Sequence, residues 1–228
     1  MTLSLVLTGC PSTSTPPTAT PAPSRSTQPI RYLALGDSYT IGESVGVSER
    51  WPVQLAGLLN SAGIKTNEPV IVARTGWTTK ELLAGLKHAD PEARFDLVTL
   101  LIGVNNQFRG LDPEDYRAEV RLLMREAIAL AGGRAKRVVV LSTPDWGVTP
   151  FARRYDAAKV AREIDAYNAI EAQEANALGL AWVDVTPISR RAKTDGTLVA
   201  RDGLHPSGRM YGLWAEAAVP AVKAALRD

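Results

Sequence analysis

The chain of 228 residues is poor in metal-binding side chains, with one cysteine and two histidines. A single cysteine cannot close an intramolecular disulfide, and so small a set does not supply the ligands of a catalytic zinc site. The phosphate-cradling patterns Gly-x-Gly-x-x-Gly and Gly-x4-Gly-Lys are also missing from the sequence. We therefore expect no cofactor and no metal, and nucleotide-dependent chemistry has no support.

Neither sign of charge predominates, since 26 basic residues face 24 acidic ones and no basic run or aromatic-basic stripe occurs. Nucleic acid is therefore not an expected partner. With 45% hydrophobic and 22% charged residues, the chain has the composition of an ordinary soluble globule and can bury a full core. The length fits one domain or a small pair, and no internal repeat is visible.

The first ten residues form a segment of their own, in which a short apolar run ends in Leu7-Thr8-Gly9-Cys10. This tetrapeptide resembles the lipobox of bacterial lipoprotein signal peptides, in which the cysteine becomes the lipidated first residue. No Lys or Arg precedes the run, which is shorter than the usual apolar region, and a start codon assigned too late would explain both features. We expect residues 1–10 to be a lipoprotein-type signal peptide; the alternative is a disordered N-terminus with an incidental thiol.

Residues 11–29 are almost entirely Ser, Thr, Pro and Ala. Such a segment cannot bury enough apolar surface to offset its ordering entropy, so we expect an extended, mobile linker. Its natural use is as a tether between a membrane and a globular domain of residues 30–228. These features predict a lipid-anchored protein of the bacterial cell envelope. Its domain would lie outside the cytoplasm, in the periplasm or at the surface, and would meet the membrane only through its anchor.

Beyond the linker, apolar runs of strand length alternate with segments of helical spacing. The expected strands are residues 30–35, 69–73, 97–102, 137–141 and 181–185, and the expected helices are residues 52–62, 79–86, 113–131, 157–178 and 207–226. Thr78 and Glu81 form a capping box before the second helix, and Pro220 should kink or shorten the last one. The alternation predicts a three-layer α/β/α sandwich around one parallel sheet of five strands.

Polar or glycine residues follow each expected strand at the point where it ends. They are Ser38, Gly76, Asn105, Asp145 and, after the fifth strand, Asp202 with His205. Because the carboxyl ends of parallel strands meet at the same edge of a sheet, we expect these residues to converge on one cleft.

A serine in such a cleft becomes a nucleophile when a base accepts its proton, and His205 is the plausible base for Ser38. Asp202, three residues before His205, can reach the other ring nitrogen and fix the tautomer. The second histidine, His88, lies in a charged segment and is expected at the solvated surface.

An oxyanion needs preorganised N–H donors. Gly76 allows a close backbone approach, the Asn105 amide offers a side-chain donor, and the backbone N–H of Ser38 offers a third. Each residue alone also fits a structural role, since Gly76, Asn105 and Asp202 suit turns and His205 suits a helix start. Their joint placement at one edge favours catalysis.

Four motifs carry this constellation, and they are Gly36-Asp37-Ser38, Gly76, Gly103-x-Asn105 and Asp202-x-x-His205. Together they resemble the four blocks of the GDSL or SGNH hydrolase family, over essentially the whole domain. The resemblance implies a flavodoxin-like fold and a serine esterase that works through an acyl-enzyme intermediate. It implies Ser38 as nucleophile, His205 as base and Asp202 as its orienter, with Ser38, Gly76 and Asn105 forming the oxyanion hole.

Two positions depart from the family pattern. Tyr39 replaces the leucine after Gly-Asp-Ser, and Asn106 replaces an acid often found after the block-three asparagine. We assign no role to position 106.

Other readings of the site compete with this one. A lipase-type α/β-hydrolase would carry Gly-x-Ser-x-Gly, and residues 36–40 do not match it. A surface lipoprotein that binds without cleaving would be expected to lose a member of the Ser-His-Asp set. No insertion is long enough to form a lid, so we expect an open cleft and a substrate with a small or accessible acyl group. The substrate is expected to be a small-molecule or glycan-linked acyl ester, with thioesters and acetylated sugars as alternatives. Five aromatic residues near the functional edge could line a pocket: Tyr39, Trp77, Phe108, Trp146 and Phe151.

Overall fold

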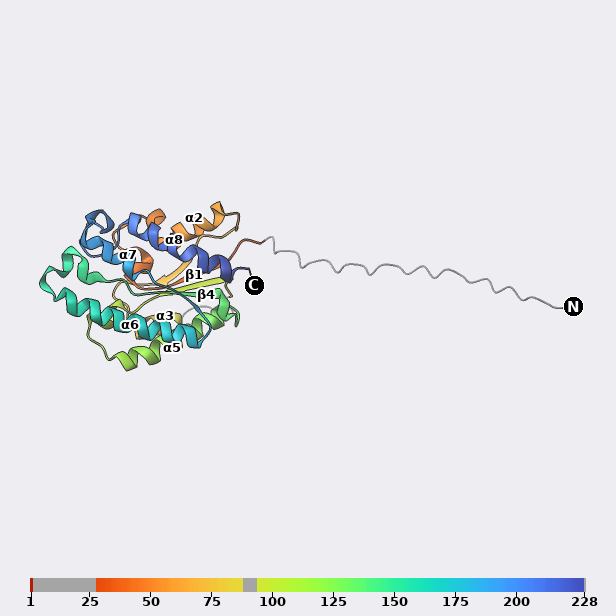
Figure 1. The fold of residues 1–228 in the computed structure, drawn as a ribbon, viewed down its shortest axis with the longest axis horizontal. Coiled ribbons are helices and arrows are strands. Elements are labelled where there is room, and N and C mark those ends of the chain that lie inside the picture. Colours follow the sequence, from red (N-terminus) through yellow and green to blue (C-terminus); the bar gives the residue numbers. More distant parts are fainter. Residues whose placement is uncertain (2–27, 88–93, 228) are drawn as a thin grey trace.

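The computed structural model describes residue 1 and residues 28–87 and 94–227 (Figure 1). Cys10, most of the expected linker and His88 lie outside these residues. The described chain folds around one sheet of five parallel strands in the order β2-β1-β3-β4-β5. The strands are β1 (Tyr32–Gly36), β2 (Val70–Ala73), β3 (Leu97–Leu101), β4 (Val138–Leu141) and β5 (Ala181–Val183). This order is that of a flavodoxin-like doubly wound sheet, and the expected fold class is confirmed.

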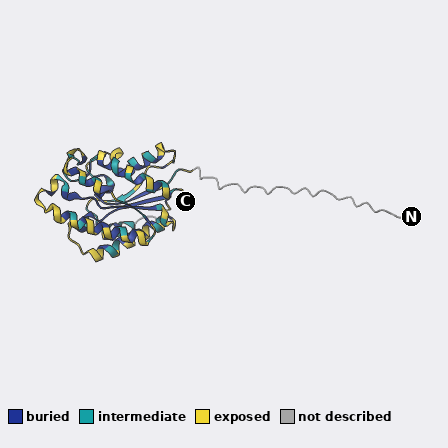
Figure 2. Ribbon diagram, in the orientation of Figure 1, coloured by how far each residue is buried: buried dark blue, intermediate teal, exposed yellow. Residues whose placement is uncertain are grey.

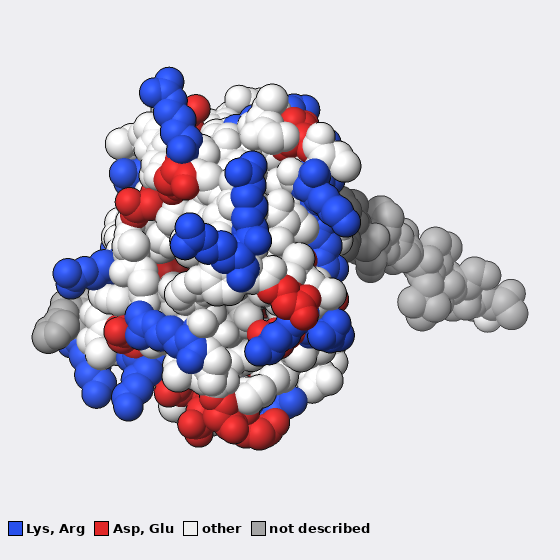
Figure 3. All heavy atoms as spheres, turned by 90° about the vertical axis from the view of Figure 1, so that its left-hand side faces the viewer, with Lys and Arg blue, Asp and Glu red and all other residues white. Residues whose placement is uncertain are grey.

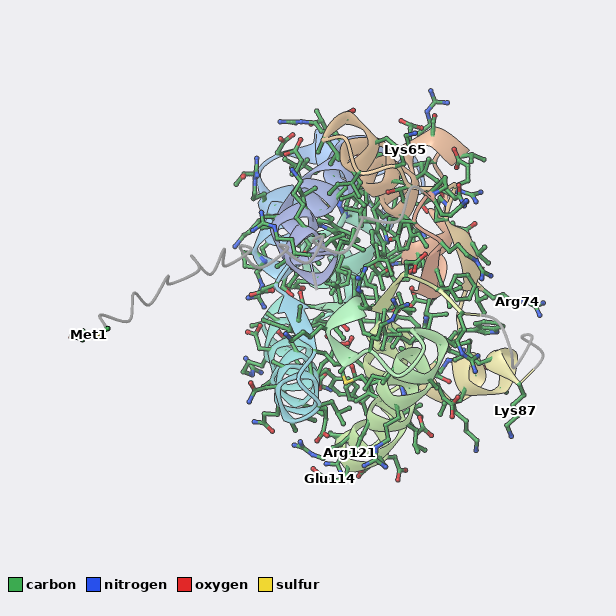
Figure 4. The ribbon with its side chains drawn as sticks, turned by 90° about the vertical axis from the view of Figure 1, so that its right-hand side faces the viewer. Met1, Lys65, Arg74, Lys87, Glu114 and Arg121 are labelled. Atoms are coloured by element: carbon green, nitrogen blue, oxygen red, sulfur yellow. The ribbon has the colours of Figure 1, made fainter. Side chains whose placement is uncertain are left out.

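Helices cover both faces of the sheet, as Figure 1 shows. The helices α2 (Trp51–Ser61) and α8 (Gly208–Ala225) pack against each other on one face, and α3 (Thr79–Leu86), α5 (Pro113–Leu130) and α6 (Ala157–Ala177) pack together on the other. Lys65, which follows α2, and Arg121 of α5 accordingly lie on opposite sides of the molecule (Figure 4). No helix of the described chain is long and apolar enough to cross a membrane.

The period of two along the strands divides the core between the two faces. Tyr32 and Ala34 belong to the cluster that packs under α2 and α8, whereas Leu33 and Leu35 belong to the cluster under α3, α5 and α6. The three central strands are fully buried, and the edge strands β2 and β5 are partly exposed (Figure 2). Such continuous apolar strands are typical of a parallel sheet covered on both sides.

The expected helix starts are confirmed by their caps. Thr78 Oγ1 accepts the Glu81 N–H, and Glu81 in turn accepts the Thr78 N–H at 2.8 Å. The Asp112 carboxylate accepts the Glu114 N–H at 2.7 Å ahead of Pro113, the first residue of α5. These side chains satisfy backbone donors that the helices leave unpaired.

Three short helices were not predicted: α1 (Ser38–Ile41), α4 (Val104–Phe108) and α7 (Thr186–Arg190). Each has four or five residues, which is too short for an apolar period to show. They begin just after β1, β3 and β5, and they therefore shape the carboxyl edge of the sheet.

One predicted boundary was wrong. Strand β5 stops at Val183 instead of residue 185, because the N–H groups of Val185 and Thr186 leave the sheet to bond Ser142 Oγ at 2.8 and 3.1 Å. The last helix, α8, continues past Pro220 to Ala225, close to the expected end, so Pro220 does not shorten it. Pro220 and Glu216, whose carbonyl loses its helical partner, both face solvent, where water can replace the missing bond.

Candidate active site

The local structure at the end of β1 explains why glycine, aspartate and serine occupy the three positions of the Gly-Asp-Ser motif. A Cβ on Gly36 would lie 2.4 Å from the Leu101 carbonyl oxygen, so only glycine fits beside β3. Asp37 caps α1, and its Oδ1 accepts the Tyr39 N–H at 3.0 Å. Ser38 is then the first residue of the short helix, at the carboxyl edge of the sheet.

Ser38, His205 and Asp202 form one chain of hydrogen bonds. His205 Nε2 lies 3.0 Å from Ser38 Oγ, and His205 Nδ1 lies 2.6 Å from Asp202 Oδ2. An ionised carboxylate only accepts, so Nδ1 carries the ring proton and Nε2 is free to accept the proton of Ser38. The structure thus brings together three residues that are up to 167 positions apart in the sequence.

The Asp202 carboxylate is held by four donors. Its Oδ1 accepts the N–H groups of Leu204 and His205 at 2.9 and 3.0 Å, and its Oδ2 accepts Ser44 Oγ–H at 2.6 Å beside the imidazole. Burial acts to raise the pKa of Asp202, but the hydrogen bonds from Ser44, Leu204 and His205 outweigh it and hold that pKa well below the ordinary value. Asp202 is therefore ionised. Ser44 has a positive φ of 66°, and no sequence motif pointed to it.

Asn105 lies between the serine and the glycine segment. Its Nδ2 donates to the Trp77 carbonyl at 2.9 Å and lies 3.4 Å from Asp37 Oδ2. Gly76, the residue before Trp77, has a φ of +81°, a conformation that favours glycine. Asn105 thus touches the residue beside Ser38 on one side and the residue beside Gly76 on the other. Asp145 is not part of this group, because its carboxylate pairs with Arg190 at 2.9 Å.

A model of the GDSL-like lipase/acylhydrolase family matches residues 34–213, which is most of the chain and includes all four motifs. The chain belongs to this family. It is therefore an ester hydrolase of the GDSL/SGNH type.

Solved structures agree with this fold. The chain resembles TesA at 21% identity and a TM-score of 0.69, covering 86% of this chain and 99% of TesA. It resembles Axe2, an acetylxylan esterase from Geobacillus stearothermophilus, at 22% identity and a TM-score of 0.67, covering 85% of this chain and 94% of Axe2. The chain also resembles the esterase EstA from Pseudoalteromonas sp., at 16% identity and a TM-score of 0.63, and the match covers 87% of this chain and 99% of EstA. No curated protein matches the sequence.

The structure gives a role to Asn106, one of the two departures from the family pattern. Its Oδ1 accepts the Thr79 N–H at 3.0 Å, and its Nδ2 donates to Thr79 Oγ1 at 2.6 Å. Thr79 Oγ1 donates its own proton to Glu119, so it can only accept from residue 106. An aspartate has no proton to give there, whereas asparagine supplies both groups.

Arg109, just after α4, completes a clamp on the glycine segment. Its Nη2 donates to the Gly76 carbonyl at 2.5 Å, and its Nη1 lies 3.3 Å from Glu81. With Asn105 on Trp77 and Asn106 on Thr79, one short helix and its cap hold residues 76–79. Arg109 is a positioning residue for the Gly76 peptide.

Arg109→Ala should lower kcat about tenfold, or about 1.4 kcal/mol in the barrier, with KM within a factor of about two. The reason is that the Gly76 carbonyl loses the donor that fixes its orientation, while the contacts of Arg109 in the structure are with Gly76 and Glu81. Arg109→Lys keeps a donor and should recover part of the loss. Arg125→Ala, an exposed arginine of α5, is the matched control. A rise in KM at constant kcat would show instead that Arg109 contacts the substrate.

Asp37 is a buried carboxyl with no cationic partner among the described residues. Burial raises its pKa to about 7, against the opposing hydrogen bonds from the Tyr39 N–H and the Asn105 amide. In the unfolded chain the same group titrates near its ordinary value of about 4. The folded state therefore holds a proton between about pH 4 and 7 that the unfolded state has lost.

The free energy of unfolding should consequently fall as pH rises from 4 to 7, because only the folded form needs Asp37 protonated. The side chain of Asp37→Asn cannot ionise, so the free energy of unfolding of this variant should not show this fall. Between pH 4 and pH 8 the stability of the variant relative to wild type should rise on the order of 4 kcal/mol, measured by urea unfolding. Glu126→Gln, at an exposed site on α5, should follow the wild type. A constant offset between Asp37→Asn and wild type at both pH values would contradict the expectation.

The cavity beside His205 is small, with a volume of about 10 Å³. Tyr39 and Trp146, two of the five expected pocket aromatics, line it, and the Tyr39 ring centre lies 5.2 Å from that of His205. Phe108 and Phe151 pack beside Trp146 but are largely exposed. Trp77 instead covers Gly85 of α3, where a Cβ would lie 2.5 Å from its ring. Among the described residues no His, Cys, Asp and Glu side chains group as metal ligands would.

Proposed function

We propose that this protein hydrolyses carboxylic esters with small or accessible acyl groups, with Ser38, His205 and Asp202 as its catalytic triad. The observation that carries the proposal is the hydrogen-bond chain from Ser38 Oγ through the imidazole to the ionised Asp202, at 3.0 and 2.6 Å. Ser38 Oγ attacks the acyl carbon while its proton moves to His205 Nε2. Asp202 stabilises the imidazolium through Nδ1 without taking the proton.

The imidazolium then gives this proton to the leaving alkoxide oxygen, and an alcohol departs from the acyl-enzyme. In the second half, His205 takes a proton from water, the hydroxide attacks the acyl carbon, and Ser38 leaves with the proton returned to it. The acid is released and the free serine is restored. The developing oxyanion would be held by the N–H groups of Ser38 and Gly76 and by Asn105 Nδ2. Of the two Nδ2 protons, one is given to the Trp77 carbonyl at 2.9 Å, and the other, in the long 3.4 Å hydrogen bond to Asp37, would turn to the oxyanion.

The substrate preference rests on the lean domain. No insertion between the motifs is long enough to form a lid, which favours an open cleft and small or accessible acyl groups. The cavity of about 10 Å³ beside His205 is not lined by Ser38, Gly76 or Asn105, so it does not set the acyl length. Axe2, one of the similar structures, is an acetylxylan esterase. Acetylated sugars are therefore the alternative substrates with the best support, and thioesters remain a second alternative.

A panel of water-soluble acetyl, butyryl and octanoyl esters, an acetyl thioester and an acetylated xylooligosaccharide tests the proposal, with Ser38→Ala as control. We expect kcat/KM to be highest for acetyl esters and to fall as the acyl chain lengthens. Activity that survives in Ser38→Ala would overturn the serine mechanism. A preference for octanoyl over acetyl would overturn the small-acyl assignment and leave the mechanism standing.

We further propose that the protein is anchored at the cell envelope through lipidated Cys10 and the linker of residues 11–29. Expression in a bacterial host with the natural N-terminus should yield a protein that sediments with membranes and carries acyl groups on Cys10, whereas Cys10→Ala should be soluble. Ser61→Ala, a surface change on α2, should sediment like the wild type. A freely soluble wild type that retains Met1 would contradict the anchor for this start site.

A further inference from the structure

Three exposed aromatic rings gather at the carboxyl edge of the sheet. Phe108, Phe151 and Tyr155 are 46%, 42% and 46% exposed, which is unusual for such large side chains. Their ring centres lie about 6 Å apart, at 6.2, 6.1 and 5.8 Å, and all three rest on the buried Trp146. We call these three residues the aromatic patch. Its three rings form one contiguous exposed apolar surface, unlike single scattered hydrophobic residues, which need no explanation.

The aromatic patch adjoins the catalytic residues. The Phe151 N–H donates to the Gly203 carbonyl at 2.9 Å, within the turn between Asp202 and His205. Phe108 is the last residue of α4, the helix that carries Asn105. Trp146, beneath the patch, lines the cavity beside His205. The patch therefore flanks the mouth of the site.

Two arginines accompany the rings. Arg153 and Arg154 lie between Phe151 and Tyr155 in the sequence, both are exposed, and neither forms an ion pair within the described part of the chain. Asp156, which follows Tyr155, is also exposed, and its carboxylate accepts the Lys159 N–H at 3.0 Å as the cap of α6. Figure 3, which views the molecule from the carboxyl edge, shows Lys and Arg side chains standing out over this face, with Asp and Glu side chains between them.

We propose that the aromatic patch, with Arg153 and Arg154, docks the catalytic face onto an anionic lipid bilayer. Aromatic rings prefer the boundary between headgroups and acyl chains, and neighbouring basic side chains are drawn to anionic headgroups. Because the rings touch one another, they form a continuous surface and leave no slot for a single chain. A flat partner fits such a surface better than a dissolved monomer. Membrane binding through the aromatic patch goes beyond the proposed esterase activity, and it does not depend on which ester the enzyme hydrolyses.

The test uses the full chain with Cys10→Ser, so that no acyl group can be attached, and measures co-sedimentation with vesicles. We expect binding to vesicles of equal parts phosphatidylglycerol and phosphatidylcholine, and much weaker binding to phosphatidylcholine alone. Arg153→Ser/Arg154→Ser should weaken the anionic binding about fivefold per arginine, and high salt should remove that difference. Phe151→Ser/Tyr155→Ser should weaken binding about tenfold on both vesicle types.

Leu122→Ser/Arg125→Ser is the matched control, because it removes one exposed apolar side chain and one arginine from the outer face of α5. It should bind vesicles like the parent. Ser38→Ala should also bind like the parent, which separates docking from catalysis. If melting curves show the Phe151→Ser/Tyr155→Ser variant to be unstable, Phe151→Gln/Tyr155→Gln replaces it.

Three results would overturn the proposal. The first is a parent chain that does not bind anionic vesicles. The second is a control variant that loses as much binding as the patch variants. The third is a Phe151→Ser/Tyr155→Ser variant that binds vesicles normally but shows a raised KM for a water-soluble acetyl ester, which would make the aromatic patch a substrate subsite.

Discussion

Ser38→Ala and His205→Ala are each expected to lower kcat by a factor on the order of 10⁶, and the double variant should be barely worse than either. The two side chains are 3.0 Å apart and transfer one proton between them. Once the hydroxyl is gone, the imidazole has no proton to accept, and once the imidazole is gone, the hydroxyl has no base. Single-turnover and steady-state rates on an acetyl ester measure these losses.

Two controls keep this test specific. Ser61→Ala makes the same chemical change at the surface of α2, and His88→Ala removes the second histidine of the sequence. Both should retain near-wild-type kcat. If the losses at Ser38 and His205 multiplied in the double variant, the two residues would not share a proton, and the triad would have to be abandoned although the fold is intact.

The convergence of Ser38, Asn105, Asp202 and His205 could be predicted because topology alone produces it. Parallel strands deliver their carboxyl ends to one edge, whatever the details of side-chain packing. Once the apolar runs had identified the strands, the residues that follow them were bound to be neighbours. The sequence motifs then only needed to assign chemistry to positions that the sheet had already brought together.

The supporting contacts could not be predicted, because they join side chains with no shared motif. Ser44 lies 158 positions from Asp202 and reaches it from a loop with a positive φ. Arg109 meets Gly76 because α4 exists, and α4 is too short to have a sequence period. Trp77 was expected in the pocket, but Gly85 leaves room on α3 that the indole fills instead. Such contacts depend on packing, which a single sequence does not encode locally.

Asp202→Asn should lower kcat about 10⁴-fold although it hardly changes the shape of the side chain. The four donors around Asp202 explain why. The N–H groups of Leu204 and His205 both point at Oδ1, so the oxygen of an asparagine must stay on that side. Its NH₂ group then takes the place of Oδ2, facing Ser44 Oγ and His205 Nδ1.

An amide N–H that faces Nδ1 donates to it and forces the ring proton onto Nε2. His205 Nε2 would then carry a hydrogen toward Ser38 Oγ and could not accept the serine proton. Ser44 Oγ can accept from the new amide, so the variant should fold with little loss of stability. Nitrogen chemical shifts of the imidazole measure the tautomer directly, and with two histidines in the sequence, His88→Ala assigns the signals. We expect the proton on Nδ1 in the wild type and on Nε2 in Asp202→Asn. An Asp202→Asn variant that kept the proton on Nδ1, or that lost less than about tenfold in kcat, would show that Asp202 does not control the base.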